Sequence, residues 1–263
     1  MSNSQAIVSS SLRSTLPSNL SEPIIEKLDD VAIAACSGIS IDEIDAEEVT
    51  LVSVLIDGSW SMRKYRDDVI NEYNNSFLKA LQGAKNADSI LVSMMYFANG
   101  QTKLIHNFKP ISQCSPLTAN DYDPDGDTPL YKAAVIGMTG IWDYGNTLIG
   151  SGVRLKRIVL LVSDGGENSS KSFTKATVKS LSNQLLDTES CVLSYIFLGD
   201  ENEGDQYAED IGFPPEHRLK EDIRKSGGEK ACRRIFGTAS ASVISTSQST
   251  ITNISANNFF VNP

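Results

Sequence analysis

Asp57, Ser59 and Ser61 place one carboxylate and two hydroxyls within a single D-x-S-x-S pattern. These groups are hard oxygen ligands, which suit Mg²⁺, Mn²⁺ or Ca²⁺ and not Zn²⁺. The pattern directly follows the apolar run 51–56, which is typical of a buried strand in a parallel sheet. Because ligands of open α/β sheets gather at the carboxyl ends of the strands, we expect a divalent cation to bind here.

Two later segments offer further oxygen ligands. Thr128 lies in a loop punctuated by Gly and Pro, just before a helical stretch. The run 157–163 reads as a second buried strand, and it leads directly into Asp164 and two glycines. Two carboxylates supply negative charge to a divalent cation. Neutral hydroxyls can complete its shell without over-neutralising it, so the ion can still attract another carboxylate.

Together these segments resemble the von Willebrand factor A (vWA) domain family over about residues 49–247. The family's metal-ion-dependent adhesion site uses D-x-S-x-S, a distant Thr and a distant Asp. The resemblance therefore implies the metal ligands Asp57, Ser59, Ser61, Thr128 and Asp164. It also implies that the hydroxyls coordinate directly, that at least one Asp acts through water, and that one coordination position stays open for an acidic side chain of a partner protein. The implied function is metal-dependent binding.

The C-terminal part narrows the resemblance. Residues 231–245 look like the last helix of standalone bacterial vWA proteins, including those of tellurium-resistance and stress operons, and residues 208–216 have the same look. This implies a partner such as an operon-encoded phosphatase, kinase or AAA ATPase. The alternative is a scaffold protein with a structural metal, which binds its partners through residues 1–48, outside the resemblance.

Trp60 lies between the two serines of the D-x-S-x-S pattern, in a loop that we expect to be exposed. Two interpretations are open. The ring folds back onto the rim of the sheet, or it is an aromatic anchor that contacts the partner, a role in which Trp is enriched.

A second acidic cluster precedes Thr128. Asp121, Asp123 and Asp125 match the first half of a calcium loop, D-x-D-x-D-G, but Lys132 occupies the closing position that normally holds a bidentate Glu. The alternatives are a second calcium site with these three ligands, or an acidic, solvated loop beside the main ion.

Composition argues against several classes of partner. With 33 acidic and 23 basic residues, the net charge is −10, so neither nucleic acid nor an anionic membrane finds a basic patch. No apolar run is long enough to span a bilayer. The N-terminal segment lacks the features of a signal peptide, and the four cysteines lack metal or disulfide spacing. We therefore expect a cytoplasmic protein with reduced thiols.

Catalysis is not indicated, and we expect no enzyme. The sequence has only two histidines, His106 and His217, and it lacks the common nucleophile, nucleotide and zinc-hydrolase motifs. A phosphotransferase of the haloacid dehalogenase type also places Asp at the end of its first strand. That mechanism needs a second Asp two residues later, where this chain has Ser59.

Alternating strand and helix patterns predict an α/β, doubly wound, mostly parallel sheet with one antiparallel edge strand and helices on both faces. Strands are expected near 50–57, 89–97, 102–108, 157–164, 190–198 and 216–222. Helices are expected near 22–36, 63–83, 129–141, 171–187 and from 228 into the tail, with loops over 109–128 and 199–205. We divide the chain into a mobile arm (1–20), an N-terminal extension (21–48), the vWA domain (49–247) and a C-terminal tail (248–263).

Overall fold

The computed structural model describes residues 2–250 and 253–260, and a six-stranded sheet forms its centre. The strand order is β3-β2-β1-β4-β5-β6, and every neighbouring pair is parallel except β2 and β3. The predicted fold class, including its single antiparallel edge strand, is therefore confirmed. The strands are β1 (Glu48–Asp57), β2 (Ile90–Ala98), β3 (Gln101–Pro110), β4 (Arg154–Ser163), β5 (Cys191–Phe197) and β6 (Arg218–Lys220).

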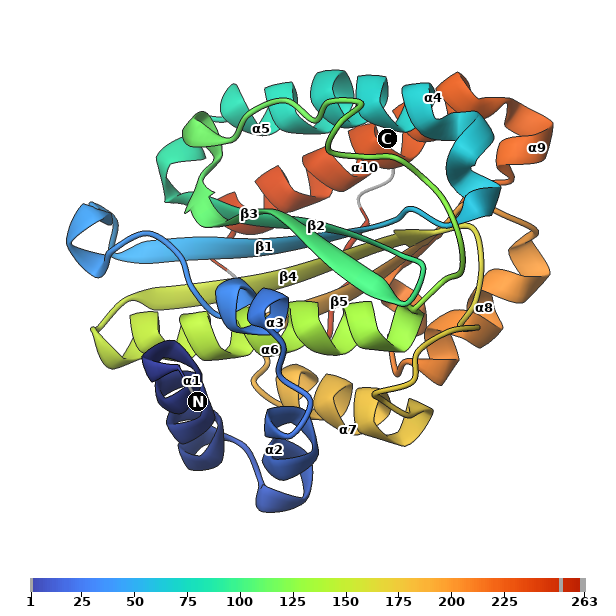
Figure 1. The fold of residues 1–263 in the computed structure, drawn as a ribbon. Coiled ribbons are helices and arrows are strands. Elements are labelled where there is room, and N and C mark those ends of the chain that lie inside the picture. The colour runs from blue at the N-terminus through green and yellow to red at the C-terminus, as the bar shows by residue number, and fades with distance from the viewer. Residues whose placement is uncertain (1, 251–252, 261–263) are drawn as a thin grey trace.

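Helices cover both faces of the sheet (Figure 1). On one face lie α4 (Arg66–Glu72), a π-helical segment η3 (Tyr73–Leu78), α5 (Lys79–Gln82) and α10 (Gly228–Gln248). On the other lie α6 (Leu130–Gly150) and α7 (Lys175–Leu186), with α1 (Asn3–Thr15), α2 (Ser18–Ile25) and α3 (Asp30–Ala35) packed against them. Two further helices, α8 (Glu201–Asp210) and α9 (Ile223–Ser226), follow β5 and β6. Short 3-10 turns are η1 (Ile41–Glu43), η2 (Trp60–Tyr65), η4 (Ala87–Ser89), η5 (Ile111–Gln113) and η6 (Pro215–His217).

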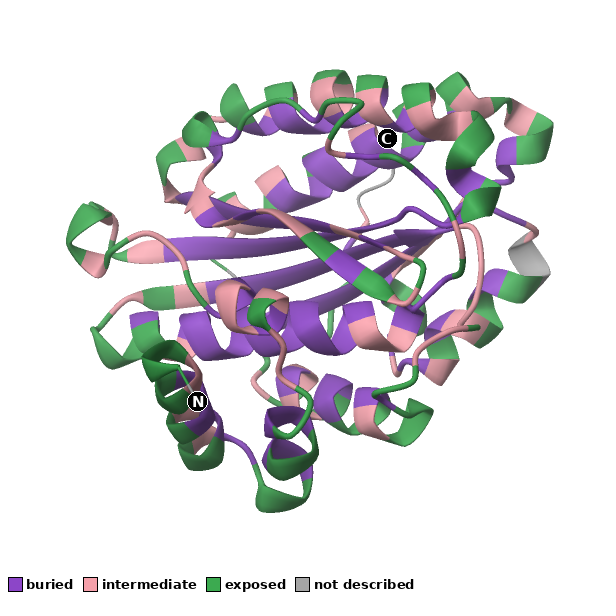
Figure 2. Ribbon diagram, in the orientation of Figure 1, coloured by how far each residue is buried: buried purple, intermediate pink, exposed green. Residues whose placement is uncertain are grey.

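The two helix layers explain the apolar runs of the central strands. In β1, Val52, Val54 and Ile56 pack against the α4 and α10 layer, whereas Leu51 and Leu55 pack against the α6 layer. Both faces of β1 are thus removed from water, and Figure 2 shows the central strands as buried. A strand covered on both sides needs apolar residues at nearly every position. This requirement explains the apolar run 51–56 that predicted a buried strand.

The expected mobile arm over residues 1–20 is wrong for the described part of that segment. Val8, Leu12, Leu16 and Leu20 are buried, and they recur every four residues. This spacing forms one apolar stripe along α1 and into α2, which covers α6 and α7. The indole N–H of Trp142 on α6 also donates a 3.0 Å hydrogen bond to Thr15 Oγ1. The serine-rich composition of this segment led to the prediction of a mobile arm, although the apolar stripe is present in the sequence.

Several boundaries also differ from the prediction. The helix expected over 22–36 is split between α2 and α3, because Asp29 starts a new helix by accepting a hydrogen bond from the Ala32 N–H. The loop expected over 199–205 already contains the start of α8. The helix expected to end near 141 continues to residue 150 as α6, and part of the tail is packed, since Ile254 and Phe259 are buried.

Close packing of α3 against α6 depends on Gly140. A Cβ added there would lie 2.5 Å from the carbonyl oxygen of Ala35, which is backbone and cannot rotate away. We expect Gly140→Ala to lower the free energy of unfolding by about 1–3 kcal/mol in urea titrations. Gly237→Ala in α10 is the matched control, because a Cβ there meets nothing within 4 Å. It should stabilise by up to about 1 kcal/mol through helix propensity. Equal effects of the two changes would contradict this packing.

Candidate metal centre

The candidate ligands come from three segments that end at the same edge of the sheet. Asp57 is the last residue of β1, and Asp164 directly follows β4. These strands are parallel neighbours, with Ile56 paired to Val162, so their carboxyl ends lie side by side. Thr128 lies just before α6, whose first turn begins at the same edge, at the right of Figure 1.

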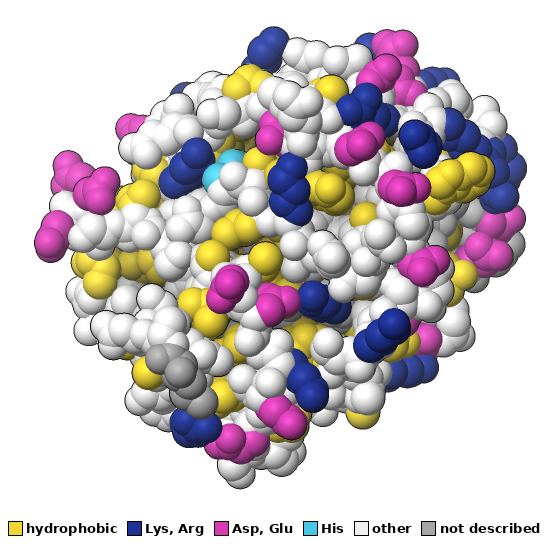
Figure 3. All heavy atoms as spheres, viewed as in Figure 1, with side chains coloured by type: hydrophobic (Ala, Val, Ile, Leu, Met, Phe, Trp, Pro, Cys, Tyr) yellow, Lys and Arg dark blue, Asp and Glu magenta, His cyan; other side chains and the backbone are white. Residues whose placement is uncertain are grey.

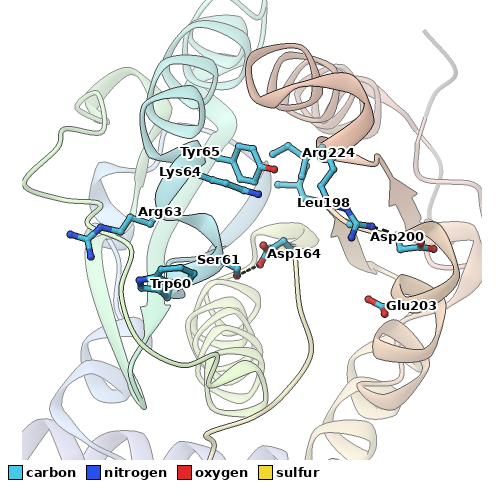
Figure 4. A pocket seen from close by; sticks show the side chains of 12 residues that line it. Trp60, Ser61, Arg63, Lys64, Tyr65, Asp164, Leu198, Asp200, Glu203 and Arg224 are labelled. Carbon is cyan, nitrogen blue, oxygen red and sulfur yellow. Dashed lines mark hydrogen bonds and ion pairs between the residues drawn. The ribbon is translucent and has the colours of Figure 1, made fainter.

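Direct contacts join most of these side chains. Asp57 Oδ1 accepts a 2.7 Å hydrogen bond from the Ser59 N–H, and the hydroxyl oxygens of Ser59 and Ser61 are 3.1 Å apart. The Ser61 hydroxyl donates a 2.7 Å hydrogen bond to Asp164 Oδ1, drawn as a dashed line in Figure 4. Thr128 Oγ1 lies 3.9 Å from the position that a Cβ would take on Gly165, the residue after Asp164. The structure thus joins Asp57, Ser59, Ser61 and Asp164 through a chain of contacts and places Thr128 beside Gly165.

The charge of Lys64 acts on Asp164, but among the described residues neither carboxylate of the pair has a cation in direct contact. Within residues 2–250 and 253–260, neither Asp57 nor Asp164 forms an ion pair. Burial is the main cause that raises the pKa of Asp57 to about 7, and the nearby Asp164 raises it further, against the hydrogen bond from Ser163. Burial also raises the pKa of Asp164. A bound divalent cation would remove both penalties, and the donor set of carboxylates and hydroxyls fits such an ion.

Three supporting residues were not predicted from the sequence. The Ser163 hydroxyl donates to Asp57 Oδ2, and the Tyr122 hydroxyl donates a 2.7 Å hydrogen bond to the Asp57 carbonyl oxygen. Asn168 Oδ1 accepts a 2.7 Å hydrogen bond from the Thr128 N–H. Only Ser163 left a signal, because it directly precedes Asp164 at the end of a strand. Such contacts orient metal ligands.

Backbone hydrogen bonds hold the ligand loops to one another. The Gly58 N–H donates to the carbonyl oxygen of Phe97 at the end of β2, at 2.9 Å. The Gly58 carbonyl oxygen in turn accepts from the Asp125 N–H at 2.8 Å, and the Trp60 N–H donates to the Gly126 carbonyl oxygen at 2.9 Å. The loop with the two serines and the loop before Thr128 are therefore fixed without any ion.

The second acidic cluster does not form a ligand set. Asp121 accepts hydrogen bonds from the backbone and the hydroxyl of Thr118. Asp123 lies 3.7 Å from Arg66, and Asp125 lies 3.9 Å from Arg63. In the described part of the chain, no three side chains of the types His, Cys, Asp and Glu are grouped to hold a metal ion. These carboxylates point to separate partners, as in the alternative of an acidic, solvated loop.

Trp60 does not fold back onto the sheet. Its side chain is 65% exposed at the rim of the site, beside a pocket that also contains Ser61 and Asp164 (Figure 4). The histidines lie elsewhere and are buried: His106 Nδ1 is 3.1 Å from the Val92 carbonyl oxygen, and His217 Nε2 is 3.2 Å from that of Asn257.

Comparisons with known proteins support the fold. No family model and no curated protein sequence matches the chain. Among solved structures, the vWF domain of the type V pili tip protein Mfa5 from Porphyromonas gingivalis aligns with a TM-score of 0.50 at 11% identity, over 74% of this chain and 96% of that one. The chain has a vWA-type fold.

Two further solved structures align with this chain over much of its length. They are the PilB minor pilin from Streptococcus sanguinis, as its D319A mutant (TM-score 0.54, 13% identity), and the pilus adhesin SpaC from Lactobacillus rhamnosus GG in its open conformation (0.53, 14%). Each alignment covers 76% of this chain, but only 62% of PilB and 30% of SpaC. At such low identity, the likeness extends to the fold alone. Among the described helices, none combines the length and apolar character needed to cross a membrane.

Proposed function

We propose that this chain is a metal-dependent protein-interaction module. A divalent cation, Mg²⁺ or in its place Mn²⁺ or Ca²⁺, binds among Asp57, Ser59, Ser61, Thr128 and Asp164. It bridges to a Glu or Asp side chain of a partner protein. The observation that carries this proposal is the pair of carboxylates, neither of them in an ion pair among the described residues, joined to neutral hydroxyls at the carboxyl edge of the sheet. The two carboxylates balance the charge of a divalent ion without exceeding it, and with at least one of them acting through water the ion keeps an open position for a carboxylate of the partner.

The finer assignments belong to the same proposal. The resemblance of the C-terminal part to vWA proteins of stress operons favours an operon-encoded phosphatase, kinase or AAA ATPase as the partner. All four cysteines are free and buried, which suits a reducing cytoplasm. The protein acts by binding and not as an enzyme.

A pull-down tests the proposal. Immobilised wild-type protein is incubated with a lysate of the source organism in Mg²⁺ or in chelator, beside the Asp57→Asn variant in Mg²⁺. We expect one set of proteins to be retained only by the wild type in Mg²⁺. Retention of the same proteins under all three conditions would favour the alternative, a scaffold that binds through residues 1–48. Those residues include the helices α1–α3, which are packed against the rest of the molecule.

A further inference from the structure

A pocket of about 580 Å³ adjoins the candidate metal centre. Ser61 and Asp164 belong to both, so the pocket and the cation site form one continuous surface (Figure 4). Its lining includes two buried apolar side chains. They are Leu198, which directly follows β5, and Ile223, the first residue of α9. This volume lies in the range of pockets that enclose a ligand group.

Two aromatic side chains, Trp60 and Tyr65, line this pocket. Trp60 is one of the few large apolar side chains that the described residues leave exposed, and Tyr65 follows it in the same 3-10 turn. An exposed Trp costs hydrophobic free energy unless something covers it, and Trp is enriched where a partner does so. The pocket thus offers an apolar and aromatic lining to a side chain that enters from the cation side.

Charges are distributed unevenly around the pocket rim. On the metal side, Lys64 Nζ lies 4.6 Å from the ring centroid of Tyr65, and its positive charge acts on Asp164. Arg224 is already paired with Asp222 at 3.3 Å and with Asp200 at 3.8 Å. Figure 3 shows Lys and Arg side chains at the upper right of the molecule, with Asp and Glu side chains among them. With a cation bound, the metal side of the rim is positive.

We propose that the partner presents a short segment with two features. One is the acidic residue that reaches the cation, and the other is a large apolar or aromatic side chain, within about three residues of it, that fills the pocket. This inference deepens the proposed function and rests on it. Leu198 and Ile223 in the pocket lining select for apolar character, and Lys64 at the rim favours a second acidic residue in the same segment. A chain segment suits the surface because one backbone places both side chains.

Selection of displayed random short peptides on the immobilised protein tests this inference. In Mg²⁺, we expect the recovered peptides to share a Glu or Asp with a Trp, Phe, Leu, Ile or Met close by, and to be released by chelator. Trp60→Ala should lower the affinity for a recovered peptide by about tenfold or more, and Lys64→Ala should lower it by a smaller factor. Ile7→Ala is the matched control, since Ile7 is 62% exposed on α1, and it should bind the peptide as the wild type does. Calorimetry with Mn²⁺ should show unchanged metal affinity in Trp60→Ala.

The outcomes separate this inference from the proposed function. Selection on Trp60→Ala should still recover acidic peptides but without the apolar preference, a result that a purely structural role of Trp60 would not give. Recovery of Mg²⁺-dependent acidic peptides without apolar enrichment from the wild type would overturn the inference and leave the proposed function standing. Failure to recover any Mg²⁺-dependent peptide, or peptides equally bound in chelator, would count against both.

Discussion

The Asp57→Asn variant should bind Mg²⁺ and Mn²⁺ about a hundredfold more weakly than the wild type. At pH 8 it should nevertheless unfold at a higher temperature than the metal-free wild type. Asn has the shape of Asp, and its amide can accept from the Ser59 N–H and donate to the Ser163 hydroxyl, so both contacts of the wild-type side chain are retained. The variant removes only a buried charge without a cationic partner. Thermal unfolding with and without the ions, together with calorimetric titration, measures both effects.

The sign of the stability change follows from the pKa of Asp57, which burial raises from 3.8 to about 7 in the folded protein. Between these values the folded state binds more protons than the unfolded state, so the metal-free wild type loses stability as the pH rises. At pH 8 the loss is complete, at roughly 4 kcal/mol. The advantage of Asp57→Asn should therefore be large at pH 8, smaller at pH 5 and smallest near pH 4. In wild-type protein, Mg²⁺ at about a hundred times its Kd should restore about 2.7 kcal/mol.

A rise in the melting temperature of Asp57→Asn with Mg²⁺, as large as in the wild type, would show that the ion binds elsewhere. Wild-type protein whose melting is unmoved by Mg²⁺, Mn²⁺ and Ca²⁺ alike would show that the cluster is not a metal site.

Thr128→Ala is expected to weaken Mg²⁺-dependent partner binding by about tenfold or more while costing the fold about 1 kcal/mol or less. The change removes one neutral ligand and leaves the net charge as it is. The Thr128 N–H still donates to Asn168 Oδ1, so the loop keeps its anchor. Binding of the partner recovered in the pull-down is measured on immobilised protein, with and without chelator. Urea unfolding measures the cost to the fold.

Thr139→Ala provides the matched control. Thr139 is also buried, lies on α6, and its hydroxyl has no hydrogen-bond partner among the described residues. It should lower stability to a similar extent and leave partner binding unchanged. If Thr128→Ala and chelation both leave binding intact while removal of α1 abolishes it, the metal bridge is wrong and the scaffold alternative holds. Such a truncation must be checked for folding, since Leu12 is fully buried.

The parts of this molecule that were predictable are those whose cause is local. A strand buried on both faces requires an apolar run, and Asp57, Ser59 and Ser61 are close in sequence because one loop holds them. The bond from Ser163 to Asp57 follows instead from the pairing of β1 with β4, and Tyr122 reaches Asp57 from a long loop. Such contacts depend on tertiary structure, which single-sequence patterns do not encode.

The errors have equally physical causes. The many serines of α1 give the segment a polar composition, and the prediction of a mobile arm relied on that composition. It overlooked the apolar residues that recur every four positions. The three aspartates before Thr128 have the spacing of a calcium loop. Spacing alone does not decide which group a carboxylate contacts. In this structure the three carboxylates contact Arg63, Arg66 and Thr118 and do not converge on one point.

Because backbone hydrogen bonds from Gly58 and Trp60 already join the ligand loops, loss of the ion leaves no segment to refold before the next ion enters. Exchange of one ion for another is then limited by how fast the incoming ion sheds its water. Mg²⁺ dehydrates reluctantly, whereas Ca²⁺ accepts looser and more variable coordination. A partner carboxylate bound to the ion would exchange by the same kind of ligand replacement, more slowly on Mg²⁺ than on Ca²⁺, so the identity of a bound cation would set the lifetime of the complex.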